Sequence, residues 1–260
     1  MLKNNFLAIS LKTIGMLGWR EIVRFYRQPS RVAAAILSPF LFWFLIGSGV
    51  GHSFSGGGSA NYLEYFFPGA ILLVILFAAV FSTISIIEDR REGFLQAVMA
   101  SPAPRGAIPI GKILGSASLA FFQSFLFILM GLALGMRFPG FHFADVTAAV
   151  LLSSLLFSTL GFLMAWQFRS IQGFHAVMNL LLMPMWFLSG ALFPAESAAG
   201  WIRFLMHLNP LYYGHRFLTA AFGLTAREGA VSASIVMLIA VLVLWVVAGF
   251  QVAQKKGLDS

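Results

Sequence analysis

The chain has 260 residues, of which 59% are hydrophobic and only 10% are charged, and its formal net charge is +8. Soluble domains are about 45–50% apolar and about 25% charged, so this composition excludes an ordinary soluble domain and predicts an all-α polytopic membrane protein. No cysteine is present, which excludes disulfides and thiolate metal sites.

The first predicted element is an amphipathic helix at residues 16–27, inside a cytoplasmic N-terminal segment at residues 1–31. Glu21 lies near its apolar side, where a charge is unexpected. We expect this helix to lie along the cytoplasmic membrane surface. It either anchors the first span or docks a cytoplasmic partner through its polar face, which includes Arg20, Arg24 and Arg27.

Six uncharged apolar runs follow, each close to the roughly 20 residues that cross the hydrocarbon core. Lipid offers no partners for backbone polar groups, so each run is predicted to be a transmembrane helix. Together they form a predicted six-helix transmembrane domain at residues 32–253, before a cytoplasmic tail at 254–260. The runs are 32–50, 66–87, 113–136, 146–166, 173–195 and 231–253.

Most of the 17 lysines and arginines lie on one side of these predicted spans, the side of the N-terminus. Positive charge gathers on the cytoplasmic side of membrane proteins, so both termini are expected in the cytoplasm. We therefore expect a multi-pass protein of the bacterial inner (plasma) membrane, in contact with lipid. Because topology accounts for the basic charge, no nucleic-acid partner is needed.

The longest predicted cytoplasmic loop, residues 88–112, begins with charged residues and continues as a short helix with one apolar stripe. An exposed apolar stripe favours contact with a partner, although it could also rest on lipid headgroups. The charged residues are Glu88, Asp89, Arg90, Arg91 and Glu92, and the stripe is Phe94, Leu95, Val98 and Met99.

A further apolar stretch, residues 201–223, contains too many polar side chains to span the membrane. It belongs to a predicted outer region at 194–223, which is expected to dip into the interface as a re-entrant segment before the last span. Its most distinctive residues are Asn209, Pro210, Tyr212, Tyr213 and Arg216.

The sequence does not favour nucleotide binding, proton-coupled transport, metal binding or catalysis by this chain. Residues 106–112 match the start of a phosphate-binding loop, but Ile113 replaces the Ser or Thr that holds Mg²⁺ and Pro109 removes a backbone donor. None of the nine acidic residues lies inside a predicted span, which disfavours a proton-coupled carrier. The histidines are too scattered for a metal site, and no catalytic motif is present, so we do not expect an enzyme.

The order of these features resembles the membrane subunit of ABC-2 type transporters. The matching residues are the charged loop with Glu92-Gly93, then Phe94-Leu95, Ser101-Pro102, Arg105 and Gly111-Lys112, and finally the run from Asn209 to Tyr213. The resemblance covers the whole chain.

This resemblance implies a homodimeric permease that pairs with two copies of a separate cytoplasmic ABC ATPase. The ATPase would use ATP and Mg²⁺, and this chain would bind no cofactor. The helix at residues 88–100 would be the coupling helix, with the helix at 16–27 beside the same interface. The expected function is outward transport of an amphipathic or lipid-linked glycan, lipid or drug. A non-transporting membrane scaffold or assembly factor and a passive channel or carrier remain alternatives.

Overall fold

The computed structural model describes residues 2–54, 62–138 and 140–254, and all regular structure among these residues is helical. The helices are α1 (Leu2–Tyr26), α2 (Pro29–Phe54), α3 (Tyr62–Ser82), α4 (Ile84–Arg91), α5 (Phe94–Ala100), α6 (Ala107–Ala133), α7 (Phe143–Gln167), α8 (Ile171–Phe187), η1 (Ala195–Ser197), α9 (Gly200–Leu208), α10 (Pro210–Ala221) and α11 (Glu228–Gln254). All of the predicted tail except Gln254 lies outside the described residues.

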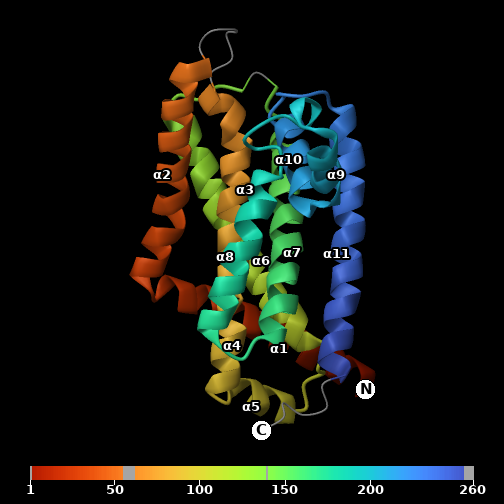
Figure 1. Cartoon of the computed structure of the whole chain (residues 1–260). Helices are drawn as coiled ribbons and strands as arrows, with labels where there is room; N and C mark the ends of the chain where they lie inside the picture. Colours follow the sequence, from red (N-terminus) through yellow and green to blue (C-terminus); the bar gives the residue numbers. More distant parts are fainter. Residues whose placement is uncertain (1, 55–61, 139, 255–260) are drawn as a thin grey trace.

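The long helices run side by side in one bundle, with α3 near its centre (Figure 1). Helix α3 packs against α2, α6 and α7, whereas α11 lies at the edge against α7 and α10. Helix α1 crosses one end of the bundle, where α4, α5 and the beginning of α6 also lie, and α9 and α10 cover the opposite end (Figure 1). The last described turn of α11 is at the α1 end, so both described ends of the chain lie at the same end of the bundle.

Four helices of the described residues are long and apolar enough to cross a membrane, namely Tyr62–Arg91, Ala107–Ala133, Phe143–Gln167 and Glu228–Ala253. The first of these joins α3 and α4. Its most apolar window and that of α11 have the same mean hydropathy, 2.8, but 89% of the first and only 22% of the second is buried within the chain. Helix α2 has 26 residues and α8 has 17.

The structure corrects two predicted boundaries. The fifth apolar run was expected to remain helical to Ala195, but α8 ends at Phe187 because the chain then turns, with Gly190 in a left-handed conformation at φ +92°. The amphipathic N-terminal helix begins at Leu2, well before the predicted start at Met16.

Candidate functional site

The predicted cytoplasmic loop is largely helical. Its first four residues, 88–91, complete α4, and α6 already begins at Ala107. Gly93 separates α4 from α5 with a left-handed backbone at φ +75°, which a residue with a side chain rarely adopts. The turn therefore folds α5 sharply away from α4 at the end of the bundle (Figure 1).

A buried lysine joins three helices at this end. Lys112 of α6 has 1% of its side chain exposed, and its ammonium group contacts the carboxylates of Glu21 in α1 and Asp89 in α4, which are 3% and 0% exposed. The hydroxyl of Ser85 lies 3.4 Å from the same nitrogen. Charges this deeply buried require paired partners. The contact explains why Glu21 lies on the apolar side of its helix.

The arginines of α1 extend this cluster. Nη1 of Arg20 and Nη1 of Arg24 donate to Oδ1 of Asp89 at 2.6 and 2.9 Å. Nη2 of Arg24 is 3.1 Å from Oε2 of Glu88 and 3.2 Å from Oε1 of Glu92. Burial acts to lower the pKa of the Arg24 guanidinium, but the surrounding carboxylates outweigh this and raise its pKa above the ordinary value.

We call these residues the ion-pair cluster: Arg20, Glu21, Arg24, Glu88, Asp89, Glu92 and Lys112. Arg20 and Arg24 form their ion pairs within the chain, on the side of α1 that faces α4. Arg27, the third arginine of the predicted polar face, remains exposed. The cluster holds α1, α4 and the start of α6 together as one assembly.

The apolar stripe of α5 faces the chain, which corrects the expectation that it is exposed. Leu95 is fully buried, while Phe94, Val98 and Met99 are half-buried against the core. The guanidinium carbon of Arg20 lies 3.7 Å from the centroid of the Phe94 ring, a cation–π contact. Burying these side chains removes apolar surface from water and fixes α5 on the bundle.

The outward face of this end therefore consists of other residues. Arg91, Glu92, Gln96, Ala97 and Ala100 are exposed on α4 and α5 and the turn between them. Among the contact residues predicted between 88 and 99, Arg91 and Glu92 are the exposed ones, and Glu92 also pairs with Arg24. A partner that binds here would mainly contact this face, since the stripe packs against the chain.

Arg90 fastens α4 to another part of the bundle. Its Nη1 donates to the carbonyl of Phe168 at 3.1 Å, and its Nη2 donates to the carbonyl of Trp166 at 2.8 Å. Its guanidinium carbon also lies 5.2 Å from the centroid of the Trp166 ring. Arg90 thus connects α4 to the link between α7 and α8.

The predicted outer motif lies at the opposite end and forms the corner between α9 and α10. Oδ1 of Asn209 accepts a hydrogen bond from the backbone N–H of Leu211 at 3.0 Å, which caps α10, and Pro210 begins that helix. The amide nitrogen of Asn209 donates to the carbonyl of Met185 in α8. One side chain therefore fixes the corner to the end of α8.

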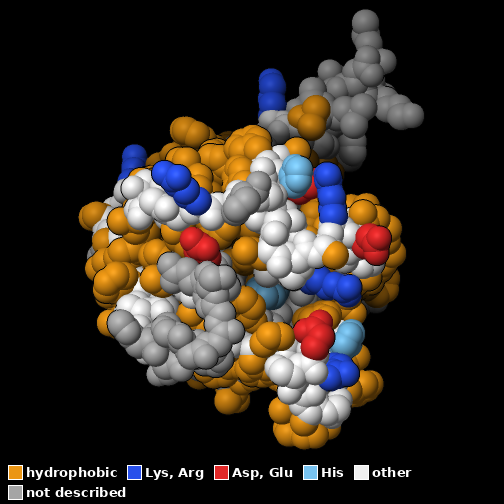
Figure 2. All heavy atoms as spheres, turned by 90° about the horizontal axis from the view of Figure 1, so that it is seen from above, with side chains coloured by type: hydrophobic (Ala, Val, Ile, Leu, Met, Phe, Trp, Pro, Cys, Tyr) orange, Lys and Arg blue, Asp and Glu red, His pale blue; other side chains and the backbone are white. Residues whose placement is uncertain are grey.

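The tyrosines of the outer motif support the same corner. Tyr212 is buried, with its ring centroid 4.9 Å from that of His207, and the Tyr213 hydroxyl donates to the carbonyl of His207 at 3.0 Å. Arg216 is exposed. Charged side chains and histidines gather on this end face inside a rim of hydrophobic side chains (Figure 2). The structure thus separates the two predicted sites by the length of the bundle.

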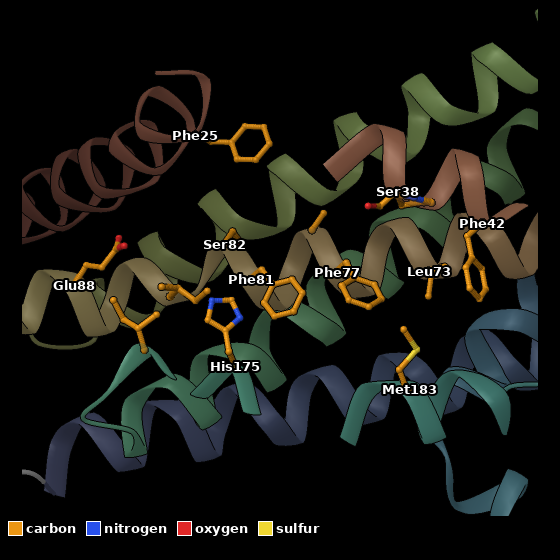
Figure 3. A pocket seen from close by; sticks show the side chains of 14 residues that line it. Phe25, Ser38, Phe42, Leu73, Phe77, Phe81, Ser82, Glu88, His175 and Met183 are labelled. Carbon is orange, nitrogen blue, oxygen red and sulfur yellow. The ribbon is translucent and has the colours of Figure 1, made fainter. Parts of the chain in front are cut away.

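A cavity of about 720 Å³ lies between α2, α3 and α8, and residues of α1 and α4 contribute to its lining (Figure 3). No sequence pattern predicted this cavity. The burial of Lys112 against Glu21 was not predicted either, although the charge of Glu21 on the apolar side of α1 was an available signal.

Comparison with known proteins places these features in a family. Residues 12–222 match the family described as ABC-2 type transporter. A transport permease named ycf38 from Cyanophora paradoxa is 28% identical over 198 residues, covering 75% of this chain and 68% of that protein. The daunorubicin resistance ABC transporter permease protein DrrB1 of Streptomyces coeruleorubidus is 23% identical, covering 74% and 69%. Nodulation protein J of Neorhizobium galegae is 23% identical, covering 75% and 73%.

Proposed function

Since the chain belongs to the ABC-2 type transporter family, whose members are the membrane component and not the ATPase of an ABC transporter, we propose that it is the permease of an ATP-driven exporter. Its substrate would be an amphipathic or lipid-linked glycan, lipid or drug, which moves outward across the bacterial inner membrane. Hydrolysis of ATP with Mg²⁺ would take place on a separate cytoplasmic subunit.

The proposed topology has six spans, formed by α2, α3 with α4, α6, α7, α8 and α11. Helices α2 and α8 run alongside the four helices that are long and apolar enough to cross a membrane, which supports this count (Figure 1). The end that carries α1, α4 and α5 would face the cytoplasm, as the distribution of basic residues predicts. Helices α9 and α10 would form the re-entrant region of the outer leaflet, where Trp201, Phe204 and Leu208 expose apolar surface to lipid.

The proposed assembly has two permease copies and two ATPase copies. Asn179 supports the pairing of two permeases, because it lies exposed on α8 although a polar amide in hydrocarbon needs a partner. A second copy packed against α8 would supply one.

The ion-pair cluster is the observation that carries this proposal. Motion of the ATPase must reach the spans through a cytoplasmic element that moves as a rigid unit. The cluster joins α1, α4 and α6 through buried charges, and Leu95 fixes α5 to the same unit. We propose that the ATPase contacts the exposed face of α4 and α5, and that the cluster passes its motion on to α3 and α6.

A pair of identical substitutions tests the coupling site. Ala97→Asp adds a charge to the exposed face of α5, and Ala226→Asp adds the same charge to an exposed position at the other end of the chain's bundle. The permease is co-expressed with its partner ABC ATPase, and co-purification and ATP-dependent export are measured. We expect Ala97→Asp to reduce both at least about tenfold, since a buried unpaired charge costs several kcal/mol, and Ala226→Asp to leave both intact.

The alternatives predict different results in the same system. A scaffold or assembly factor would purify without an ATPase and show no export. A passive channel or carrier would release substrate from liposomes without ATP. Full export by the Ala97→Asp variant would contradict the proposed contact face, and uphill transport by the permease alone would contradict the exporter.

A further inference from the structure

The cavity between α2, α3 and α8 has an apolar body and one polar end (Figure 3). Its volume of about 720 Å³ falls within the range of small-molecule sites, about 300–1,000 Å³. Glu88 and His175 lie at one end, whereas Phe42, Leu73 and Met183 lie at the other (Figure 3). The remaining lining is mainly aromatic and aliphatic and includes Phe25, Phe77 and Phe81.

The polar end carries a carboxylate that the protein satisfies incompletely. Oε2 of Glu88 is 3.1 Å from Nη2 of Arg24, yet this buried oxygen receives no aligned hydrogen bond. Arg24 is shared with Asp89 and Glu92. The ion-pair cluster contains four carboxylates and three cationic side chains, so its formal charge is −1 although the whole chain is at +8.

We propose that this cavity binds an amphipathic cation, with a flat or flexible apolar body among the phenylalanines and an amine near Glu88 and His175. A buried carboxylate with spare acceptor capacity favours an ammonium donor, and aromatic side chains favour apolar and cationic groups over anions. The site would be the substrate-binding site of the exporter, so this inference rests on the proposed function.

The direction of the cavity fits this type of ligand. Its polar end lies toward α1 and α4, the proposed cytoplasmic end, and its apolar end lies deeper along α3. An amphipathic cation in the inner leaflet has the same orientation, with its amine at the interface and its apolar body in the hydrocarbon. Entry from the inner leaflet would therefore require no reversal of the molecule.

Binding of three matched probes to the purified permease in lipid nanodiscs tests the proposal. 1-Pyrenemethylamine, 1-pyrenemethanol and 1-pyreneacetic acid share one aromatic body and differ in charge. Energy transfer from tryptophan to pyrene reports binding, because Trp186 lies against Phe42 of the lining with ring centroids 5.3 Å apart. After subtraction of empty nanodiscs, we expect the amine to bind at least about tenfold more tightly than the alcohol, and the acid most weakly. Equal binding of all three probes, or preference for the acid, would overturn the proposal.

Substitutions at two glutamates provide a matched pair of variants. Glu88→Gln removes the carboxylate that lines the cavity, and Glu92→Gln removes one that shares Arg24 but is exposed and lies outside the cavity. We expect Glu88→Gln to reduce amine affinity about tenfold without changing that of the alcohol, and Glu92→Gln to change neither more than about twofold. An equal loss in both variants would show a general effect of charge and refute the site.

A third variant and the choice of readout make this test independent of ATP-driven export and of whether Glu88→Gln folds. Phe77→Ala shortens the apolar wall and should weaken the amine and the alcohol alike. The comparison of probes on the unmodified chain is decisive even if Glu88→Gln fails to fold. These measurements use the permease without an ATPase, so charge-selective binding without ATP-driven export would reject the exporter and retain the site. Export without charge-selective binding would reject the site and retain the exporter.

Discussion

Removal of the cation at position 112 should destabilise the fold strongly. Lys112→Met keeps most of the side-chain volume but leaves Glu21 buried, because Lys112 is the only charged group that contacts Glu21 among the described residues. Asp89 loses the same partner but keeps Arg20 at 2.6 Å and Arg24 at 2.9 Å. The variant therefore creates one uncompensated buried charge, which costs about 3–5 kcal/mol.

The companion variant separates charge from packing. Replacing both Glu21 and Lys112 by methionine removes the orphaned carboxylate with its partner, and buried pairs exchanged for apolar side chains often lose little stability. We expect the double variant to lie within about 2 kcal/mol of the unmodified protein.

Unfolding in increasing SDS, followed by fluorescence of the six tryptophans, measures these free energies. In thermal scans, the loss for Lys112→Met corresponds to a decrease in Tm of roughly 6–20 °C. A loss below about 1 kcal/mol, or a double variant that is less stable than Lys112→Met, would refute the account of the cluster.

Two further predictions concern helix contacts and are measured in the same unfolding assay. Asn209→Ala removes the cap of α10 and the hydrogen bond to Met185, so we expect a loss of about 1–2 kcal/mol; an unchanged stability would show that the corner does not depend on this side chain. Gly115→Ala places a Cβ 2.9 Å from the Cβ of Glu21 and should cost about 1–3 kcal/mol by forcing α1 from α6. The control, Gly249→Ala, meets no atom within 4 Å and should be neutral or slightly stabilising.

The sequence predicted the long helices well where their ends coincide with a change in polarity. The runs at 146–166 and 231–253 lie inside α7 and α11, because charged or polar residues bound them. The end of α8 was missed because residues 188–195 remain apolar while the backbone turns at Gly190. Hydropathy reports which solvent a segment prefers and gives no information on its dihedral angles.

The candidate sites were predictable in part. The charged residues 88–92 and the arginines of α1 were identified as functional candidates, but the sequence could not show that they bind one another. Lys112 was placed in the loop because a lysine next to an apolar run usually marks the membrane boundary. Its burial depends on two carboxylates from distant parts of the chain, and such long-range pairing leaves no local pattern. The cavity likewise depends on how several helices meet.

The contrast between the central helix α3 and the peripheral helix α11 bears on how the two tolerate substitution. Hydropathy is equal in their apolar windows, yet side chains of the same chain surround α3, whereas most of α11 is not covered by the chain. On α11, one aliphatic residue should replace another freely, and spectroscopic labels could be attached there. On α3, each replacement must match the original in shape, so a library of apolar variants should retain far fewer functional members.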